Sequence, residues 1–144
     1  YGPSFIQRAL AHFLHQGRLK AHLRRMLPVY RERRDGLLLS LRRYLPKDVT
    51  WTEPGGGFST WVTLPQPTMR QVYQVALQHG IAFTPGDAFL VPPGANQHMR
   101  LCFGSQSVAD LDDILSILGR LIAQPERYAR PAGEKVNNLW TSLA

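Results

Sequence analysis

The chain has 144 residues, 44% of them hydrophobic, and carries a net charge of +7. This length suits one ordinary globular domain, and no apolar run approaches the roughly 18 residues that a membrane span requires. The single cysteine, Cys102, excludes an internal disulfide and is typical of a reducing compartment. Because the first residues do not have the charged-then-apolar layout of a signal peptide, we expect a cytoplasmic protein with no membrane partner.

The positive charge is concentrated in the first third of the chain. Such a run can bind nucleic acid or phosphate, but it is more often the solvated face of a helix, and no aromatic residues suited to stacking on bases accompany it. A solvated helix is therefore favoured over an independent nucleic-acid-binding domain. The run comprises Arg18, Lys20, Arg24, Arg25, Arg31, Arg33, Arg34, Arg42 and Arg43.

Two helices are predicted before residue 46. Ser4 and Gln7 have the spacing of a capping box, so the first helix is predicted to begin at Ser4 and to end or be interrupted at Gly17. Apolar residues then recur at steps of three and four up to Pro46, interrupted only where Arg33 and Arg34 occupy the stripe, which predicts a long second helix kinked by Pro28. The apolar stripes contain Ala9, Leu10, Phe13 and Leu14 in the first helix, and Leu19, Leu23, Met26, Tyr30, Leu37 and Leu41 in the second.

The pattern changes to a period of two after Pro46. Residues 49–51 alternate between apolar and polar, and residues 58–64 alternate in two sets, Phe58, Thr60, Val62 and Leu64 against Ser59, Trp61 and Thr63. The three glycines between them, 55–57, predict the turn of a hairpin. They could also bind a phosphate through their backbone amides, but a phosphate loop normally opens a helix, whereas this one opens a strand. The turn is therefore favoured.

Helices and short strands are predicted to alternate in the second half of the chain. Thr68 is predicted to begin a helix over 69–79 through a capping box with Gln71, and a short strand follows at 81–83. The breaker-rich loop from Asp87 to Asn96 is predicted to lack regular structure. The last helix is predicted to begin after Ser107 and to end at Pro125. Its core face would contain Leu111, Ile114, Leu115, Leu118, Leu121 and Ile122.

Arg100 stands out on a strand predicted over 98–103. Met99, Leu101 and Phe103 alternate with it, so one face of this strand would enter the core and the other would stay available. A guanidinium on a rigid strand offers a planar fork of donors that matches a carboxylate. Arg100 could bind a ligand carboxylate, or it could pair with a structural Asp or Glu. The pattern alone leaves both interpretations open.

These elements together predict an α+β fold with a small, mainly antiparallel sheet of about four strands that is covered by helices on one face. We expect one domain over residues 1–124, with long helices over 4–45 and the sheet with its helices over 48–124. Residues 125–144 are predicted to form a C-terminal tail that either docks on the domain or is disordered. A chain that begins at Tyr1 rather than Met also suggests a processed product or a piece of a longer protein.

The residues do not form a self-sufficient catalytic site. His12 and His15 are three apart on a helix but lack further ligands nearby, so no metal site is predicted. Cys102 lies in mid-strand without an adjacent base, and Ser59 has no base either, so neither is expected to be a nucleophile. An Arg100 that binds carboxylates would therefore be half of a site, and the other half must come from elsewhere.

The order of several short motifs resembles the C-terminal part of class I/II aminotransferases that have the aspartate aminotransferase fold and use pyridoxal phosphate. The resemblance covers about residues 4–121 and is strongest to the aminoadipate/kynurenine-type enzymes and to the MocR regulators, in which such a module follows a GntR-type winged helix. The motifs are His22-Leu23-Arg24-Arg25-Met26, Tyr30-Arg31-Glu32-Arg33-Arg34-Asp35, Pro54-Gly55-Gly56-Gly57-Phe58 with Trp61, Pro85-Gly86-Asp87-Ala88-Phe89 and Met99-Arg100-Leu101-Cys102-Phe103.

The resemblance implies that Arg100 binds the α-carboxylate of an amino-acid substrate, and that residues 1–124 are the small domain of a fold-type I aminotransferase. It also implies that the Schiff-base lysine and the residues that hold pyridoxal 5'-phosphate lie upstream of Tyr1. No catalytic or cofactor-binding residue is therefore expected in this chain, which alone would neither bind the cofactor nor catalyse transamination. Pro28 and the tail after Gln124 have no counterpart in the pattern.

Two hypotheses follow from the resemblance about the parent, the longer protein of which this chain would be a part. The parent would be a homodimeric aminotransferase that acts on an amino acid and a 2-oxo acid. Alternatively, it would be a GntR/MocR-type transcriptional regulator whose aminotransferase-like domain senses an effector, and which binds DNA only through a missing N-terminal module. The motifs of residues 54–58 and 85–89 favour a catalytically competent lineage, although regulators can retain them.

Overall fold

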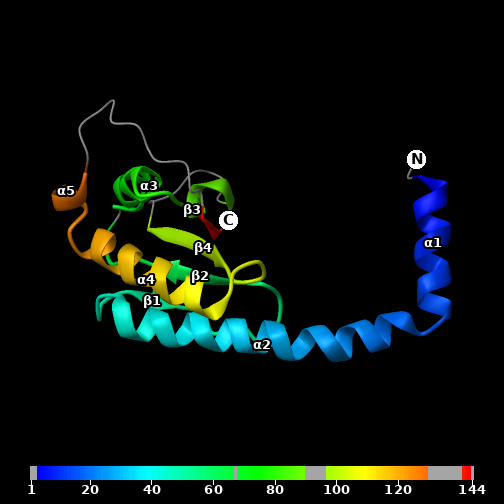
Figure 1. Ribbon diagram of the computed structural model, residues 1–144. Coiled ribbons are helices and arrows are strands. Elements are labelled where there is room, and N and C mark those ends of the chain that lie inside the picture. The colour runs from blue at the N-terminus through cyan, green and yellow to red at the C-terminus, as the bar shows by residue number, and fades with distance from the viewer. Residues whose placement is uncertain (1–2, 67, 90–96, 130–140, 144) are drawn as a thin grey trace.

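The computed structural model describes residues 3–66, 68–89, 97–129 and 141–143. Its elements, in chain order, are α1 (Ser4–His15), α2 (Arg18–Tyr44), β1 (Thr50–Trp51), β2 (Ser59–Thr63), α3 (Met69–Gln78), β3 (Ile81–Pro85), the 3-10 turn η1 (Gly86–Phe89), β4 (His98–Cys102), α4 (Val108–Ala123), α5 (Pro125–Tyr128) and β5 (Thr141–Leu143). Figure 1 shows the sheet and its helices at one end of α2 and α1 at the other.

The sheet has the strand order β1-β2-β4-β3-β5. Every pairing is antiparallel except that of β5, which runs parallel to β3. The small, mainly antiparallel sheet of an α+β fold is therefore confirmed. The fifth strand, β5, and the short helix α5 both fall in the segment predicted as a tail, and the domain boundary at residue 124 stays a prediction.

Helices cover one face of the sheet, as predicted. Leucine side chains of α2 and α4 are buried in the core, and these two helices lie side by side along the sheet (Figure 1). The third helix, α3, contacts β3 and α4. The strands supply Thr60, Val62, Phe83, Met99 and Leu101 to this buried face. The opposite face of β2, β4 and β3 stays half-exposed, because the alternation of a strand turns every second side chain away from the helices.

The apolar stripe of the two long helices is only partly covered. In α2 the buried residues begin at Leu37, and α1 has none. Leu10 is 56% exposed and Leu23 is 42% exposed, although both lie on the predicted apolar stripe. Helix periodicity therefore predicted the two helices correctly. It did not predict that, among the described residues, most apolar side chains of α1 and of the first part of α2 stay exposed.

Glycines set the turns that the sequence predicted. Gly17 separates α1 from α2 with a φ of 67°, and Gly80 follows α3 with a φ of 75°, both in the left-handed region that side chains disfavour. Residues 55–57 form the bend between the antiparallel strands β1 and β2, as the hairpin prediction required. Phe58, just before β2, is 54% exposed and packs edge-on against Tyr30.

Two of the three predicted helix caps are wrong. Ser4 lies inside α1, whose N-cap is Pro3, and neither α1 nor α3 has a side-chain cap. Thr68 does precede α3, but its backbone (φ −100°, ψ 6°) is far from the extended conformation that aims a hydroxyl at the next turn. Ser107 has that extended conformation (φ −73°, ψ 162°) and forms a complete capping box with Asp110.

The breaker-rich loop begins with a regular turn, which corrects the prediction for its first residues. Gly86–Phe89 forms the 3-10 turn η1, and residues 90–96 lie outside the described part of the chain. The helix α2 continues through Pro28, and the kink expected there stays a prediction. Within the described residues, no helix combines the length and apolar character needed to cross a bilayer.

Candidate functional site

Arg100 lies at the middle of β4, on the sheet face that the helices leave free. The strand pairing places it between Trp61 of β2 and Thr84 of β3. Its neighbours Met99 and Leu101 are fully buried on the opposite face. The strand geometry predicted for Arg100 is therefore confirmed, because the alternation of β4 anchors the strand in the core and directs the guanidinium away from it.

Two side chains hold the Arg100 guanidinium. Its Nη2 donates a hydrogen bond to Thr84 Oγ1 at 3.3 Å, and its central carbon lies 5.1 Å from the centre of the Phe89 ring. The second contact has cation–π geometry. The Nε atom of Arg100 is buried and has no hydrogen-bond partner among the described residues. The guanidinium is thus oriented by neutral groups that do not cancel its charge.

Aromatic residues extend from this contact along the same face. Trp61 packs edge-on against Phe89, with ring centres 5.6 Å apart, and stacks on His98 at 5.5 Å. The Nδ1 atom of His98 lies 3.0 Å from Thr63 Oγ1, within hydrogen-bond distance. We call Trp61, Phe89 and His98 the aromatic shelf. It lies beside the Arg100 cation, which contacts the Phe89 ring.

The alternative role of Arg100, a structural ion pair, finds no support in the described part of the chain. Three ion pairs occur there, and none includes Arg100. They are Arg34 with Asp35, Arg42 with Glu53, and Arg70 with Asp87. Among the described residues, the Arg100 guanidinium therefore has no carboxylate partner.

The turn η1 is fixed tightly against β4. A Cβ added at Gly86 would lie 2.7 Å from His98 Cβ and 3.0 Å from the His98 carbonyl oxygen, so only glycine fits without a shift. Asp87, the next residue, pairs with Arg70 at 3.5 Å through Oδ2, while its Oδ1 is buried with no partner among the described residues. Close packing at Gly86 therefore positions the turn that carries Phe89.

Sequence reasoning identified Arg100 but not the residues around it. Trp61 and Thr84 lie 16 or more positions from Arg100 along the chain and on other strands, and only the strand register brings them beside it. His98 is two residues before Arg100 on β4. The alternation in residues 58–64 did set Trp61 on the opposite face of the strand from Val62. The missing information was the pairing of β2 and β3 with β4, which local patterns do not encode.

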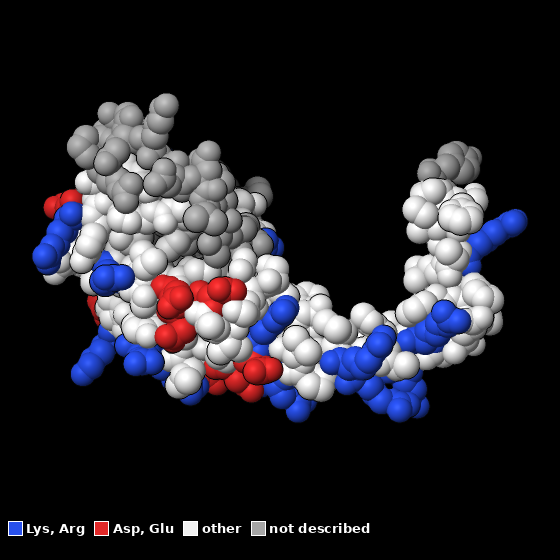
Figure 2. All heavy atoms as spheres, viewed as in Figure 1, with Lys and Arg blue, Asp and Glu red and all other residues white. Residues whose placement is uncertain are grey.

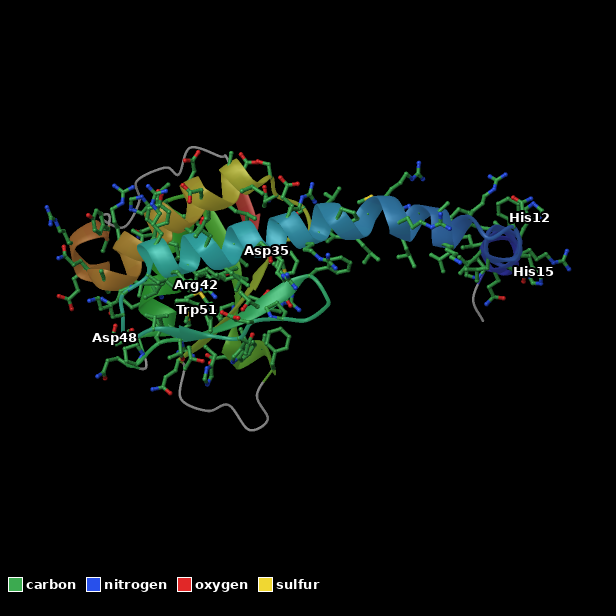
Figure 3. The ribbon with its side chains drawn as sticks, turned by 90° about the horizontal axis from the view of Figure 1, so that it is seen from below. His12, His15, Asp35, Arg42, Asp48 and Trp51 are labelled. Carbon is green, nitrogen blue, oxygen red and sulfur yellow. The ribbon has the colours of Figure 1, made fainter. Side chains whose placement is uncertain are left out.

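The other candidates take no part in this patch. Among the described residues, no three His, Cys, Asp or Glu side chains gather as a metal site would need. His12 and His15 lie on α1, at the far end of α2 from the sheet (Figure 3). Of the three lysines, Lys20 and Lys47 are exposed on α2 and just after it, and Lys135 is outside the described residues. Cys102 is half-buried at the end of β4.

The basic run forms a largely solvated helix surface, as favoured from the sequence. Figure 2 shows Lys and Arg side chains along α1 and the first half of α2. Arg33 is the main exception, since it turns inward and donates a hydrogen bond to the Gly104 carbonyl oxygen. Arg34 is half-buried and reaches the Pro54 carbonyl oxygen at 3.4 Å. These contacts explain why two arginines interrupt the apolar stripe of α2.

Comparison with known proteins identifies the family. The family described as "Aminotransferase class I and II" matches residues 1–118, which include every element from α1 through β4 and most of α4. This chain belongs to the class I and II aminotransferase family. The predicted family and its fold-type I architecture are thus confirmed, and the strand that carries Arg100 lies inside the matched region.

Relatives of this aminotransferase-family chain include both enzymes and regulators. The 2-aminoadipate transaminase of Thermus thermophilus is 30% identical over 118 residues, which is 81% of this chain and 30% of that protein. An uncharacterized HTH-type transcriptional regulator of Bacillus subtilis is 30% identical over 126 residues, 86% of this chain and 26% of that protein. Both branches named by the resemblance are therefore represented.

Solved structures of aminotransferases share the fold of this chain. The kynurenine aminotransferase of Pyrococcus horikoshii, solved with PMP, matches with a TM-score of 0.75 and 30% identity. The match covers 79% of this chain and 28% of that one. The chain thus spans less than a third of the length of the relatives it matches. The aminotransferases among these relatives depend on pyridoxal phosphate, and the Pyrococcus horikoshii structure contains PMP.

Proposed function

We propose that this chain is the C-terminal small domain of a pyridoxal-phosphate-dependent aminotransferase, and that Arg100 binds the α-carboxylate of its amino-acid or 2-oxo-acid substrate. The observation that supports this proposal is the position and the contacts of the Arg100 guanidinium. It lies on the free face of the sheet, is held by Thr84 and Phe89, and has no carboxylate partner among the described residues.

The chemistry of a guanidinium suits this role. Arginine presents parallel N–H donors that match the two oxygens of a carboxylate, and it keeps its charge at any physiological pH. A carboxylate that approaches the free face would meet this charge beside Trp61 and Phe89 of the aromatic shelf. Water screens the attraction less there than in bulk solvent. Arg100 would thereby fix the orientation of the substrate before the reaction.

The residues of this chain do not by themselves fit the cofactor. The two described lysines are exposed, on α2 and just after it, and neither is on the strands or turn that surround Arg100. We therefore assign the Schiff-base lysine and the phosphate-binding groups to the rest of the parent protein. There the pyridoxal ring would supply an electron sink, while this chain contributes substrate orientation. We expect a cytoplasmic, homodimeric parent.

A regulator is the second candidate, and the similarity to the Bacillus subtilis HTH-type protein over 86% of this chain supports it. In that case Arg100 would hold the carboxylate of an effector amino acid, and DNA would bind to a separate N-terminal module. The sequence upstream of Tyr1 distinguishes the two. A winged-helix segment ahead of the cofactor domain indicates the regulator, and a frame that begins with the cofactor domain indicates the enzyme.

The test of the proposed site is Arg100→Ala in the full-length parent. Loss of a charge-assisted carboxylate pair is expected to weaken amino-acid binding by about 2–5 kcal/mol, while the cofactor stays bound. Titration calorimetry would measure the affinity, and the absorbance of the bound cofactor would report its retention. Arg120→Ala, which removes an exposed arginine of α4, is the matched control. Unchanged amino-acid affinity in Arg100→Ala would remove Arg100 from the site.

A further inference from the structure

We propose that Thr84 and Phe89 are positioning residues, which fix the direction of the Arg100 guanidinium before a carboxylate arrives. This inference rests on the proposed function, since it concerns how Arg100 is prepared for its ligand. Neither residue is expected to touch the reacting atoms. Each would change the affinity for a carboxylate ligand only by orienting Arg100.

The hydroxyl of Thr84 restricts the rotation of the guanidinium. Thr84 faces Arg100 directly in the pairing of β3 with β4, and its Oγ1 accepts a hydrogen bond from Nη2 at 3.3 Å. Because Nη2 is tied to a strand hydroxyl and Nε is buried, the plane of the guanidinium is held relative to the sheet. A neutral acceptor can do this without cancelling the charge that a carboxylate needs.

The ring of Phe89 covers the guanidinium. With the central carbon of Arg100 at 5.1 Å from the ring centre, the ring attracts the cation without itself occupying any of the in-plane N–H donors. Phe89 is 48% exposed, so burial in the core does not explain its place. Its contacts with Arg100 and Trp61 explain its position.

The rest of the aromatic shelf holds Phe89 in place. Trp61 meets Phe89 edge-on at 5.6 Å and stacks on His98, which in turn lies within hydrogen-bond distance of Thr63. The absence of a side chain at Gly86 lets η1 approach His98 closely. Residues of β2, β4 and η1 therefore combine to present one arginine in one orientation. A long flexible side chain that is already ordered loses less conformational entropy when it binds.

The experiment is a double-mutant cycle in the full-length parent. Phe89→Leu and Thr84→Val are made in the native and in the Arg100→Ala background, and the probe is the tightest binder among the common L-amino acids, 2-aminoadipate and kynurenine. Each change is expected to weaken binding about fivefold in the native background and to have no further effect once Arg100 is absent. Phe89→Tyr and Thr84→Ser are expected to restore near-native affinity.

Controls separate positioning from general damage. Phe58→Leu removes an exposed aromatic that contacts Tyr30 instead of Arg100 and should leave the affinity unchanged. Equal loss in both backgrounds, or failure of Phe89→Tyr and Thr84→Ser to restore binding, would show a merely structural role and overturn the inference. If Arg100→Ala weakens binding but the other variants do not, the proposed function stands and the positioning role fails. If Arg100→Ala itself has no effect, the proposed function fails.

Discussion

At the scale of single residues, Asp112 joins the two core helices. Its carboxylate accepts hydrogen bonds from Ser40 Oγ at 2.7 Å and from Tyr44 Oη at 2.8 Å, so an α4 side chain is tied to two positions of α2. The bond from Ser40, followed by that from Tyr44, holds the pKa of Asp112 below its ordinary value of 3.8. The bond to Asp112 also raises the pKa of the Tyr44 phenol above 10.0.

These shifts predict how stability depends on pH. A lowered pKa favours the ionised carboxylate in the fold, so the contribution of Asp112 is complete above 3.8 and is lost as the pH falls through the folded pKa. A raised pKa favours the neutral phenol, so the contribution of Tyr44 is complete below 10.0 and is lost as the pH rises through its folded pKa. The chain should therefore lose stability at both extremes.

The measurement for the acid side is urea unfolding of the native chain and of Asp112→Asn between about pH 6 and about pH 3. The native chain should be more stable than the variant at the upper end, and the difference should shrink as the pH falls. Asp113→Asn changes the neighbouring carboxylate, which is exposed on α4, and is the control. A difference that is constant over this range would contradict the assigned hydrogen bonds.

At the scale of elements, the start of α4 depends on its cap. Ser107 Oγ accepts the Asp110 backbone N–H at 3.1 Å, and the Asp110 carboxylate accepts the Ser107 backbone N–H at 3.3 Å. Two N–H groups that the helix itself leaves unpaired are thereby satisfied. The aspartate also carries negative charge in the first turn, where the helix dipole favours it.

Ser107→Ala is expected to lower the free energy of unfolding by about 1 kcal/mol, because the alanine leaves the Asp110 N–H without its side-chain acceptor. Chemical denaturation of the native and variant chains would measure this loss. Ser107→Asp should recover most of it, because aspartate is also a good N-cap. Ser105→Ala, at an exposed position two residues before the cap, should have little effect. Equal free energies of unfolding for Ser107→Ala and the native chain would show that the capping box of Ser107 and Asp110 does not stabilise the fold.

At the scale of the full chain, a packed core domain is joined to an exposed N-terminal helix, α1, which we call the arm. The core is built from α2 after residue 36, α3, α4 and the sheet, whereas α1 buries no residue. A helix of 12 residues without buried contacts is marginal in water, since most helix stability in proteins comes from packing an apolar face. In the full-length protein proposed above, we expect other parts to cover this arm.

Hydrogen exchange of the chain alone tests this division. The amides of α1 are expected to exchange at rates close to those of an unfolded peptide, while those of α4, whose core face is buried, should exchange only through global unfolding. Mass spectrometry of peptides from each helix would measure both. Protection of α1 comparable to that of α4 would show that the arm is stabilised in a way that its exposed side chains do not indicate.

Local patterns predicted most of the elements, for physical reasons that are themselves local. Periods of 3.6 and 2, together with glycine and proline, identified α2, the hairpin of β1 and β2, α3 and β4, because each pattern depends on neighbours along the chain. The alternation of β4 likewise predicted that Arg100 points away from the core. The capping boxes at Ser4 and Thr68 failed, because a side-chain cap depends on the backbone conformation that its residue adopts.

The surroundings of Arg100 were decided by the tertiary structure alone. The sequence determined that an arginine would stand on a half-buried strand, since alternation fixes which face a side chain takes. The register that sets Trp61 and Thr84 on either side of it, and the close packing of Gly86 that brings Phe89 onto it, depend on contacts between distant segments. Such contacts form only when whole strands pair and pack, so no short window of sequence contains them.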